Sequence, residues 1–283
     1  MTALPPMLLD GRQPTASDLD WLLASRALAF GEGVFTTLRV TQGQAVFIED
    51  HLWRLQKGLA SLLYSTETFD WPLLKLEIDD LAQALQEGML KVMLLAGPGG
   101  VGYRRAKHQA WHRFIHPRRL TVNQSAYQGI ACWWQACPGS NPEPASKHLN
   151  RLSQILASEG CPDTFLEALQ YNVKGEVSEA IARNVFWYSQ GAWHTPSLAS
   201  GALAGVMRRQ LLQHLTTDQV IETSAGLAEL QQAEEVFVCN SLQGIWPVIR
   251  LEDTSGTLAH WSVGPQTQQL MAAFHPLLGL PLN

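Results

Sequence analysis

Apolar residues recur with two different periods along the first part of the chain. Residues 34–40, VFTTLRV, follow a turn marked by glycines and combine β-branched with aromatic side chains, which predicts a strand. Leucines then recur every three or four residues over 50–63, and a similar amphipathic pattern covers about 71–87, so each segment predicts a helix with one apolar face. A further apolar strand, KVMLLA, leads into a glycine-rich turn, GPGGVGY.

The second part of the chain combines the same kinds of pattern differently. Its predicted elements are strands over 131–137 and 234–241, hairpins turned at 174–175 and 190–191, and helices over 147–158 and 206–215. Pro117 and a polar run containing arginines separate the two parts, which is typical of a crossing between domains. We therefore expect an α+β protein with a smaller N-terminal domain over 1–118, a linker over 119–127 and a larger C-terminal domain over 128–283.

Composition and charge narrow the class of protein. Hydrophobic residues make up 46% and charged residues 16% of the 283 residues, which is ordinary for a globular chain that buries a sizeable core. The net charge of −5 comes without long charge runs, and no apolar run is long enough for a membrane span, so we expect neither nucleic acid nor membrane as a partner. The N-terminus lacks the basic segment of a secretion signal, and the four cysteines form no disulfide pattern, so we expect a cytoplasmic protein.

The glycine-rich turn has two interpretations. Gly97-x-Gly99-x-x-Gly102 follows a predicted strand, as a dinucleotide-binding turn does. However, Pro98 interrupts the motif, and no acidic residue lies about twenty residues further on, where such a site needs one. A structural or substrate-facing turn is the better interpretation.

Three histidines, at positions 108, 112 and 116, recur at every fourth residue. On a helix they would share a face able to hold a metal ion, but HRFIHP also has the pattern of a strand and no carboxylate ligand lies nearby in the sequence. We therefore expect no metal site. The six Lys and Arg residues of 104–119 form either a solvated basic face or a region that attracts an anionic substrate.

Lys147 is the most informative of the six lysines. It begins the helix predicted over 147–158, and the positive end of a helix would lower the pKa of its amine. A lysine that forms a Schiff base needs such an amine. Gly205 precedes the helix predicted over 206–215, so the amides of Val206 and Met207 would point at an anion such as a phosphate. A surface lysine and an ordinary helix end are the alternatives.

Seven segments, taken in chain order, together resemble one family. They are RALAFGEGVFTTLRV, HLWRL, GGVGY, SKHLNRLSQIL, EALQYNVKGEVSEAIARNVFW, GALAGVMRR and VFVCNSLQGIWPV, and they span about residues 20–250. With these segments the chain resembles the fold-type IV pyridoxal-phosphate enzymes, which include branched-chain aminotransferases, D-amino acid aminotransferases and 4-amino-4-deoxychorismate lyases. The resemblance implies a two-domain fold like that of D-amino acid aminotransferase, pyridoxal 5′-phosphate (PLP) as cofactor and a homodimer.

The resemblance also implies roles for individual residues. Lys147 matches the lysine that forms the internal aldimine with PLP, and Glu179 matches the carboxylate that keeps the pyridine nitrogen protonated. Leu203 matches the residue packed on the ring. The groups that match the phosphate site are the Arg54 guanidinium, the amides of Val206 and Met207, and the Ser241 hydroxyl.

Within the family, the chain resembles the lyases more than the aminotransferases. KHLNRL, GVFTTLRV, GVMR and CNSLQGIWPV look like lyase segments, whereas branched-chain aminotransferases have an acidic residue where Thr36 stands and a tyrosine where Leu152 stands. The resemblance implies conversion of 4-amino-4-deoxychorismate to 4-aminobenzoate and pyruvate in folate biosynthesis. The alternatives are an aminotransferase of the same fold, acting on branched-chain or D-amino acids, and a PLP-binding protein without turnover.

The proton donor and the substrate contacts stay open at this point. Lys147, Thr36 and Thr37 are candidates for protonating the leaving pyruvate. Arg39 and Tyr103 are candidates for binding the two substrate carboxylates, because of their charge and their position near the motifs.

The glycine-rich turn and the segment before it depart from the family pattern. The family usually has Asp-Arg where Ser25-Arg26 stands, and RGSGGRGY where this chain has AGPGGVGY, so two arginines are lost. The nearby cations Arg104, Arg105 and Lys107 are candidates to replace them.

Overall fold

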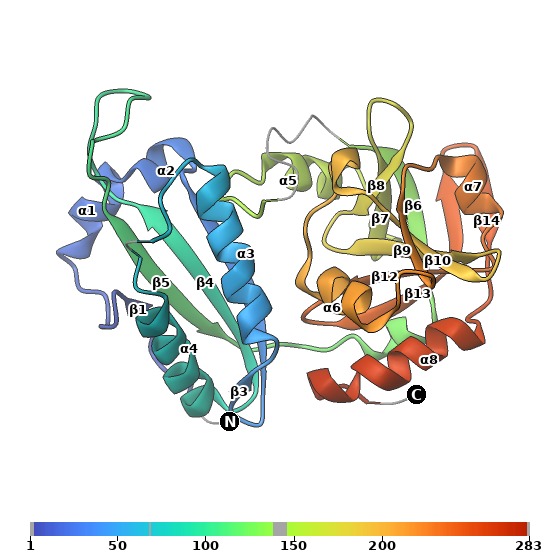
Figure 1. The fold of residues 1–283 in the computed structure, drawn as a ribbon, viewed down its shortest axis with the longest axis horizontal. Coiled ribbons are helices and arrows are strands. Elements are labelled where there is room, and N and C mark those ends of the chain that lie inside the picture. Colours follow the sequence, from blue (N-terminus) through green and yellow to red (C-terminus); the bar gives the residue numbers. More distant parts are fainter. Residues whose placement is uncertain (1–2, 68, 138–145, 282–283) are drawn as a thin grey trace. The chain divides into compact units, whose positions relative to one another are not determined.

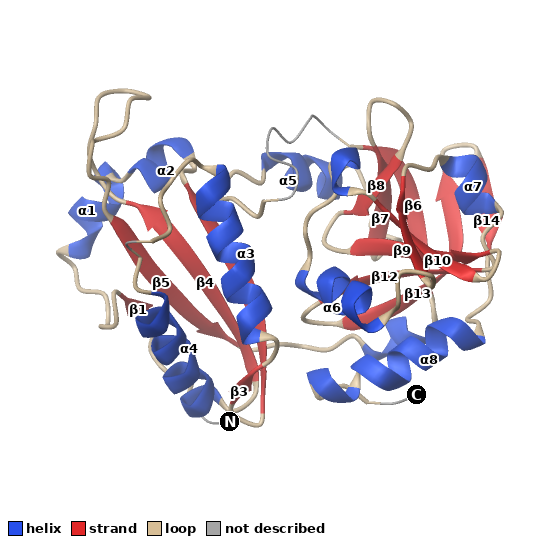
Figure 2. Ribbon diagram, viewed as in Figure 1, coloured by secondary structure: helices blue, strands red, loops and turns tan. Residues whose placement is uncertain are grey.

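The structure, a computed structural model, describes residues 3–67, 69–137 and 146–281, and these form two compact units (Figures 1 and 2). The first unit comprises the described chain up to Thr121 together with Ser146–Asn150, and the second comprises the remainder of the described chain. In the described residues, no helix is both long and apolar enough to cross a membrane.

An antiparallel sheet of five strands forms the centre of the first unit. In spatial order the strands are β1 (Leu8–Leu9), β5 (Trp111–Arg118), β4 (Gly88–Ala96), β2 (Gly33–Thr41) and β3 (Gln44–Ala45). The helices are α1 (Asp18–Ala24), α2 (Arg26–Phe30), α3 (Ile48–Ser61) and α4 (Trp71–Leu85). The two strands and the two helices predicted in this region are therefore confirmed.

The two faces of this sheet differ in chemistry. Residues at even positions of β2, such as Val34 and Leu38, belong to the core that the sheet forms with α3 and α4. A Cβ on Gly58 of α3 would lie 2.9 Å from Cγ1 of Val34, so the close approach of helix and strand at this point requires a glycine. Residues at odd positions, beginning with Phe35, point to the opposite face because side chains alternate along a strand.

A sheet of nine strands forms the centre of the second unit. Along its main path the order is β11 (Val220–Thr223), β10 (Ala192–Pro196), β9 (Asn184–Ser189), β12 (Glu235–Asn240), β13 (Gly244–Asp253), β6 (Ile130–Ala136), β7 (Glu167–Tyr171) and β8 (Val177–Ala180), and β14 (Gly256–His260) pairs with β13. The helices are α5 (Leu152–Glu159), α6 (Val206–His214), α7 (Leu227–Gln231) and α8 (Pro265–Phe274), with 3-10 turns η1 (Gln124–Gln128), η2 (Leu198–Ser200) and η3 (Pro276–Leu278).

Both hairpins predicted in the second unit are present. The antiparallel pairs β7–β8 and β9–β10 turn at Lys174–Gly175 and at Gln190–Gly191, as the glycines predict. The central strands are buried, and Phe186 of β9 stacks on Phe237 of β12 with ring centroids 5.2 Å apart. This rigid sheet supports the short β8 strand and the loops that carry several of the predicted site residues.

The segment around Lys147 differs from its prediction. The helix expected over 147–158 begins only at Leu152, and residues 147–149 pair with β2 instead, with a bridge between His148 and Val34. The helical leucine spacing therefore predicted the wrong structure for these residues, and the helix-end argument for the pKa of the lysine does not apply. The segment also belongs to the first unit, whereas the lysine was expected in the larger C-terminal domain.

Candidate active site

Lys147 is held against β2 by backbone hydrogen bonds on both sides. The Phe35 amide donates to the Lys147 carbonyl oxygen over 2.8 Å, and the Leu149 amide donates to the Gly33 carbonyl oxygen over 2.9 Å. The Lys147 Nζ atom lies 4.9 Å from the centroid of the Phe35 ring, within the range of a cation–π contact. The lysine thus stands beside the face of the sheet that carries the odd-numbered residues of β2.

That face carries a row of polar side chains across three strands. Thr37 of β2 is directly opposite Lys91 of β4, which is directly opposite His116 of β5. Directly opposite residues share a face of a sheet, so the three side chains form a row beside Phe35. The Lys91 Nζ atom lies 5.1 Å from the centroid of the same Phe35 ring. Two lysine amines therefore lie close to one aromatic ring.

The positive charges of Lys91 and Arg118 affect the titratable groups on this face. Burial lowers the pKa of the Lys91 amine, and the neighbouring Arg118 lowers it further. Burial also lowers the pKa of His116, with further lowering by Arg118 and Lys91. In the described part of the chain, neither Lys91 nor His116 has an ion pair with a carboxylate. An anionic ligand on this face would relieve the repulsion.

Arg39 and Arg118 extend the positive character of the face by one more row. They lie on β2 and β5, on either side of Met89, and Arg39 is only 5% exposed. Sequence reasoning selected Arg39 and included Arg118 in the basic stretch 104–119, but it missed Lys91 and His116 as parts of this face. Polar residues at alternate positions of the predicted strands could have pointed to these side chains. The pairing of the strands, which aligns the side chains on one face, cannot be deduced from any single segment.

Arg54 and Thr36 lie on the opposite side of β2, where α3 packs. The Arg54 Nη2 atom donates a hydrogen bond to the Thr36 hydroxyl, and Thr36 Oγ1 lies 2.6 Å from Nδ1 of His51. Thr36 and His51 are fully buried and Arg54 is 6% exposed. The two candidate threonines therefore differ: Thr36 faces α3, and Thr37 lies on the opposite face in the row with Lys91 and His116.

The glycine-rich turn is anchored by two arginines. Arg26 donates to the Gly102 carbonyl oxygen over 2.9 Å and pairs with Glu32 at 2.5 Å. Arg105 also pairs with Glu32 and donates to the Leu62 carbonyl oxygen over 2.7 Å. These partners hold the Nε and Nη1 atoms of the Arg105 guanidinium. The candidate substrate residue Tyr103, at the tip of the turn, is 89% exposed in the single chain.

Glu179 is fixed by the backbone of the loop that precedes α6. Its Oε2 atom accepts a hydrogen bond from the Leu203 amide over 2.8 Å, and the Asn184 side-chain amide donates to the Leu203 carbonyl oxygen over the same distance. Glu179 and Asn184 are both 6% exposed. The carboxylate expected at the ring nitrogen and the leucine expected on the ring are therefore joined directly. Sequence reasoning missed Asn184, although it stands in the ARNVFW segment that carried the resemblance.

The first turn of α6 has the properties of a phosphate site. Gly205 is its N-cap, no side chain caps the helix, and Val206 and Met207 follow. A Cβ on Gly205 would lie only 1.9 Å from Oδ1 of Asn184, so the backbone can pass here only as glycine. Amides of a helix start that no side chain occupies suit a phosphate, and so do the other expected donors, Arg54 and Ser241. The donor set therefore fits the phosphate of PLP.

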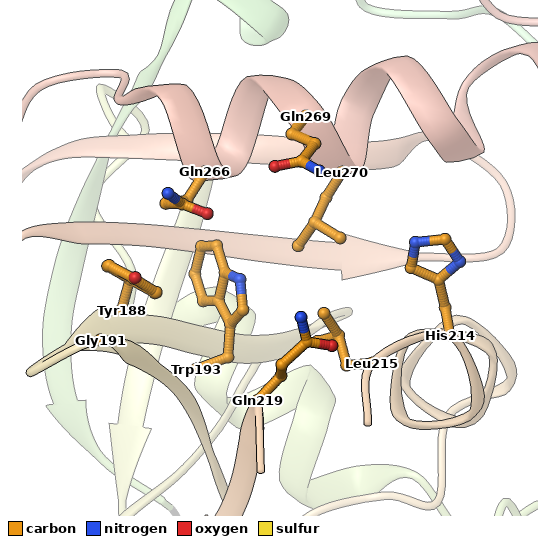
Figure 3. Close-up of a pocket in the computed structure, with 9 residues that line it drawn as sticks. All are labelled: Tyr188, Gly191, Trp193, His214, Leu215, Gln219, Gln266, Gln269 and Leu270. Atoms are coloured by element: carbon orange, nitrogen blue, oxygen red, sulfur yellow. The ribbon is translucent and has the colours of Figure 1, made fainter. Parts of the chain in front are cut away.

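The expected residues fall into two groups. Lys147, Arg54, Thr36, Thr37, Arg39 and Tyr103 belong to the first unit, whereas Glu179, Leu203, Val206, Met207 and Ser241 belong to the second. A cavity of about 140 Å³ elsewhere in the second unit is lined by Trp193, His214 and side chains of α8 (Figure 3). None of the expected residues lines this cavity, so it is not part of the candidate active site.

The histidine spacing does not produce a metal site. His112 Nδ1 lies 2.7 Å from a carboxylate oxygen of Asp10, and its Nε2 accepts a hydrogen bond from the Trp21 indole over 3.0 Å. In the described ranges no three His, Cys, Asp or Glu side chains are grouped as metal ligands.

Comparisons with known proteins identify the family. Residues 33–251 match the family described as amino-transferase class IV. The aminodeoxychorismate lyase of Vibrio harveyi is 30% identical over 237 residues, which are 80% of this chain and 85% of the relative. A putative branched-chain-amino-acid aminotransferase of Methanocaldococcus jannaschii is 24% identical over 94% of both chains. The chain therefore belongs to the class IV aminotransferases.

Solved structures give the same family. The crystal structure of 4-amino-4-deoxychorismate lyase from Pseudomonas aeruginosa has a TM-score of 0.84 with 30% identity, over 95% of this chain and 98% of that one. The branched-chain aminotransferase of Escherichia coli, with a TM-score of 0.78 and 22% identity over 96% and 93% of the two chains, shares the fold. The fold-type IV architecture and PLP as the cofactor of the family, both expected from the sequence, are confirmed.

Proposed function

We propose that this chain is a PLP-dependent lyase that converts 4-amino-4-deoxychorismate to 4-aminobenzoate and pyruvate in folate biosynthesis. Support comes first from two relatives with lyase names, each 30% identical over most of both chains. The observation that carries the proposal is the row of Thr37, Lys91 and His116 on the face beside Lys147. A substrate with two carboxylates, such as 4-amino-4-deoxychorismate, suits a face on which cations repel one another.

The residues that the resemblance implies would hold PLP. Arg54, the amides of Val206 and Met207, and Ser241 would hold the phosphate. Glu179 would hold the protonated ring nitrogen, Leu203 would pack on the ring, and Lys147 would bind the aldehyde carbon. When bound, PLP takes up the electron pair left on the substrate carbon that loses its proton.

Lys147 and Thr37 are the proposed proton carriers. Lys147 acts as the base that removes the proton from the ring carbon that bears the substrate amine. Its backbone is held in position by the hydrogen bond with Phe35 of β2. Thr37, on the same face as Phe35, is the better of the two threonines for protonating the leaving pyruvate. Thr36 is fully buried and its hydroxyl is already bonded to Arg54 and His51.

The substrate carboxylates would bind to the cationic face. Lys91 and Arg39 are proposed as their main partners, with Tyr103 closing the site from the glycine-rich turn. The carboxylate charge compensates the mutual repulsion of Lys91 and its neighbours, so binding gains from charge-assisted hydrogen bonds.

An exposed apolar surface supports a homodimer. Leu23 of α1, Leu28 of α2, and Val101 and Tyr103 of the glycine-rich turn are each more than half exposed, and the Phe30 and Tyr103 rings lie 5.5 Å apart. Surfaces of this kind mark interaction sites, and the proposed occupant is a second copy of the chain. A cytoplasmic location is proposed because the four cysteines of the sequence form no disulfide pattern.

Product analysis tests the function directly. Purified enzyme with PLP, given 4-amino-4-deoxychorismate and no second substrate, is expected to release 4-aminobenzoate and pyruvate in equal amounts. An aminotransferase is the alternative, since relatives with that name are 24–26% identical over most of the chain. That alternative predicts no 4-aminobenzoate, and transfer of the amino group from a branched-chain amino acid to a 2-oxo acid instead.

A further inference from the structure

Three buried side chains form a hydrogen-bonded series behind the proposed phosphate arginine. His51 and Arg54 lie three residues apart on α3 and therefore on the same side of the helix, and Thr36 reaches them from β2. Thr36 lies between the other two, bonded to Arg54 Nη2 on one side and to His51 Nδ1 on the other. All three residues belong to the first unit.

The chemistry of the groups fixes the direction of one of the two hydrogen bonds. A guanidinium only donates, so the Thr36 oxygen accepts from Arg54. The direction of the bond between Thr36 Oγ1 and His51 Nδ1 follows the tautomer of the ring. Burial lowers the pKa of His51 well below its usual range, and the Arg54 charge lowers it further, so the imidazole is neutral. Thr36 thus holds the guanidinium, and His51 holds Thr36, without neutralising the charge of Arg54.

The helix and the strand pack closely around the series. Gly58, one turn after Arg54 on α3, approaches Val34, two residues before Thr36 on β2, so closely that a Cβ on Gly58 would lie 2.9 Å from Cγ1 of Val34. This close packing keeps Thr36 beside Arg54, to which it is hydrogen-bonded. A long arginine side chain otherwise loses conformational entropy when it binds a ligand, and a preset position lowers this cost.

We propose that Thr36 and His51 are positioning residues that hold the Arg54 guanidinium for the phosphate group of PLP. The proposal rests on the role proposed for Arg54 in the cofactor site. It gives Thr36 a role in cofactor affinity and none in proton transfer to the substrate. The contribution is specific to the phosphate, because Arg54 has no role at the ring or at the aldehyde.

The test compares the dissociation constants of PLP and of pyridoxal, which lacks the phosphate. Both are measured by titrating tryptophan fluorescence of enzyme from which PLP has been removed. Thr36→Val keeps the shape and removes the hydroxyl, and we expect PLP binding to weaken about 5- to 100-fold while pyridoxal binding stays unchanged. Equal weakening of both ligands would mean a general structural role and would overturn the proposal.

A second series of variants tests His51. His51→Asn places a side-chain amide, which can donate or accept, near the position of Nδ1 and is expected to keep most of the PLP affinity, whereas His51→Leu is expected to lose as much as Thr36→Val. In an Arg54→Ala background, Thr36→Val should have no further effect on PLP binding, because it acts through Arg54. Additive losses in the double variant would contradict the proposal.

Thr195→Val is the matched control. Thr195 is as buried as Thr36, but its hydroxyl donates to the Val185 carbonyl oxygen in the second unit. We expect it to leave the ratio of PLP to pyridoxal affinity unchanged. If Thr36→Val lowers kcat at saturating PLP and leaves this ratio unchanged, Thr36 is a proton carrier and the inference is wrong. If the unmodified enzyme binds no PLP, it is the proposed function that fails.

Discussion

The two units fix their candidate functional groups by different means. In the first unit, Arg54 is held by the side chains of Thr36 and His51, and the cationic face is a set of side chains on neighbouring strands. In the second unit, Glu179 is held by the Leu203 amide, and the expected phosphate donors are themselves backbone amides. Loss of a side-chain partner should produce graded effects, whereas a change in backbone shape should disrupt the whole of the second group.

Lys147 is the exception in the first unit, because backbone pairing with β2 places it. Lys147→Ala leaves this pairing intact and removes only the amine. We expect turnover to fall by at least ~10³-fold and the covalently held cofactor to be lost, since no other group supplies the nucleophile. Absorbance near ~410–420 nm and product formation measure the two effects. Turnover close to that of the unmodified enzyme would contradict the role of the lysine.

Gly205→Ala tests the backbone shape in the second unit. The added Cβ would lie 1.9 Å from Asn184 Oδ1, so either the start of α6 or the asparagine must move. We expect PLP affinity to fall about 100-fold, because the phosphate loses aligned amide donors. Equilibrium titration with PLP measures the loss.

Two further variants make the test of Gly205 specific. Adding Asn184→Ala to Gly205→Ala removes the clash and should restore part of the affinity. Gly160→Ala is the control, since Gly160 has helical dihedral angles and room for a Cβ. No loss of affinity in Gly205→Ala would show that the first turn of α6 does not bind the phosphate.

Lys91→Met tests the cationic face of the first unit. Removal of the amine should raise KM for 4-amino-4-deoxychorismate about 10- to 50-fold with little change in kcat, because a charge-assisted contact is lost. Lys174→Met, in an exposed turn of the second unit, is the matched control for the loss of one positive charge. Steady-state kinetics separates KM from kcat, and equal effects of the two variants would exclude Lys91 as a substrate contact.

Glu32 gives the smallest expected effect, on stability at low pH. Burial raises the pKa of its carboxyl, but hydrogen bonds from Tyr64, Arg26 and Arg105 outweigh burial and lower it. The folded state therefore binds the proton less readily than the unfolded state, and the stabilisation is lost as pH falls below about 4.5. In Glu32→Gln this part of the pH dependence of stability should be absent. The free energy of unfolding, measured in urea between about pH 3 and 7, covers the range in which carboxyl groups titrate. An unchanged pH dependence would contradict the assignment.

The candidate cofactor residues depend on local motifs, whereas the candidate substrate residues depend on strand pairing. Motifs such as GEVSE and GALAGVMRR keep their spacing within one hairpin or one helix start, so local pattern was sufficient there. The alignment of Lys91 with Thr37 and His116 depends on the register of three strands, which no single segment contains. The ion pair of Arg105 with Glu32 joins residues far apart in the chain, so the sequence did not predict it either.

Lys147 shows how a local pattern is overruled. The leucines of KHLNRLSQIL have helical spacing, but the backbone groups of residues 147 and 149 bond to β2, more than a hundred residues earlier. The edge of a strand offers these groups partners that a frayed first helical turn would lack, so the helix begins at Leu152. The motif made Lys147 a candidate, and only the structure shows that its backbone pairs with β2.

The fate of the cofactor during turnover tests the central claim most directly. The holoenzyme is mixed with a large excess of 4-amino-4-deoxychorismate in the absence of any 2-oxo acid, and its absorbance near ~410–420 nm is followed together with 4-aminobenzoate. A lyase is expected to make many equivalents of product and to keep this band throughout. A single equivalent of reaction with permanent loss of the band, as an aminotransferase would give without an amino acceptor, would contradict the account.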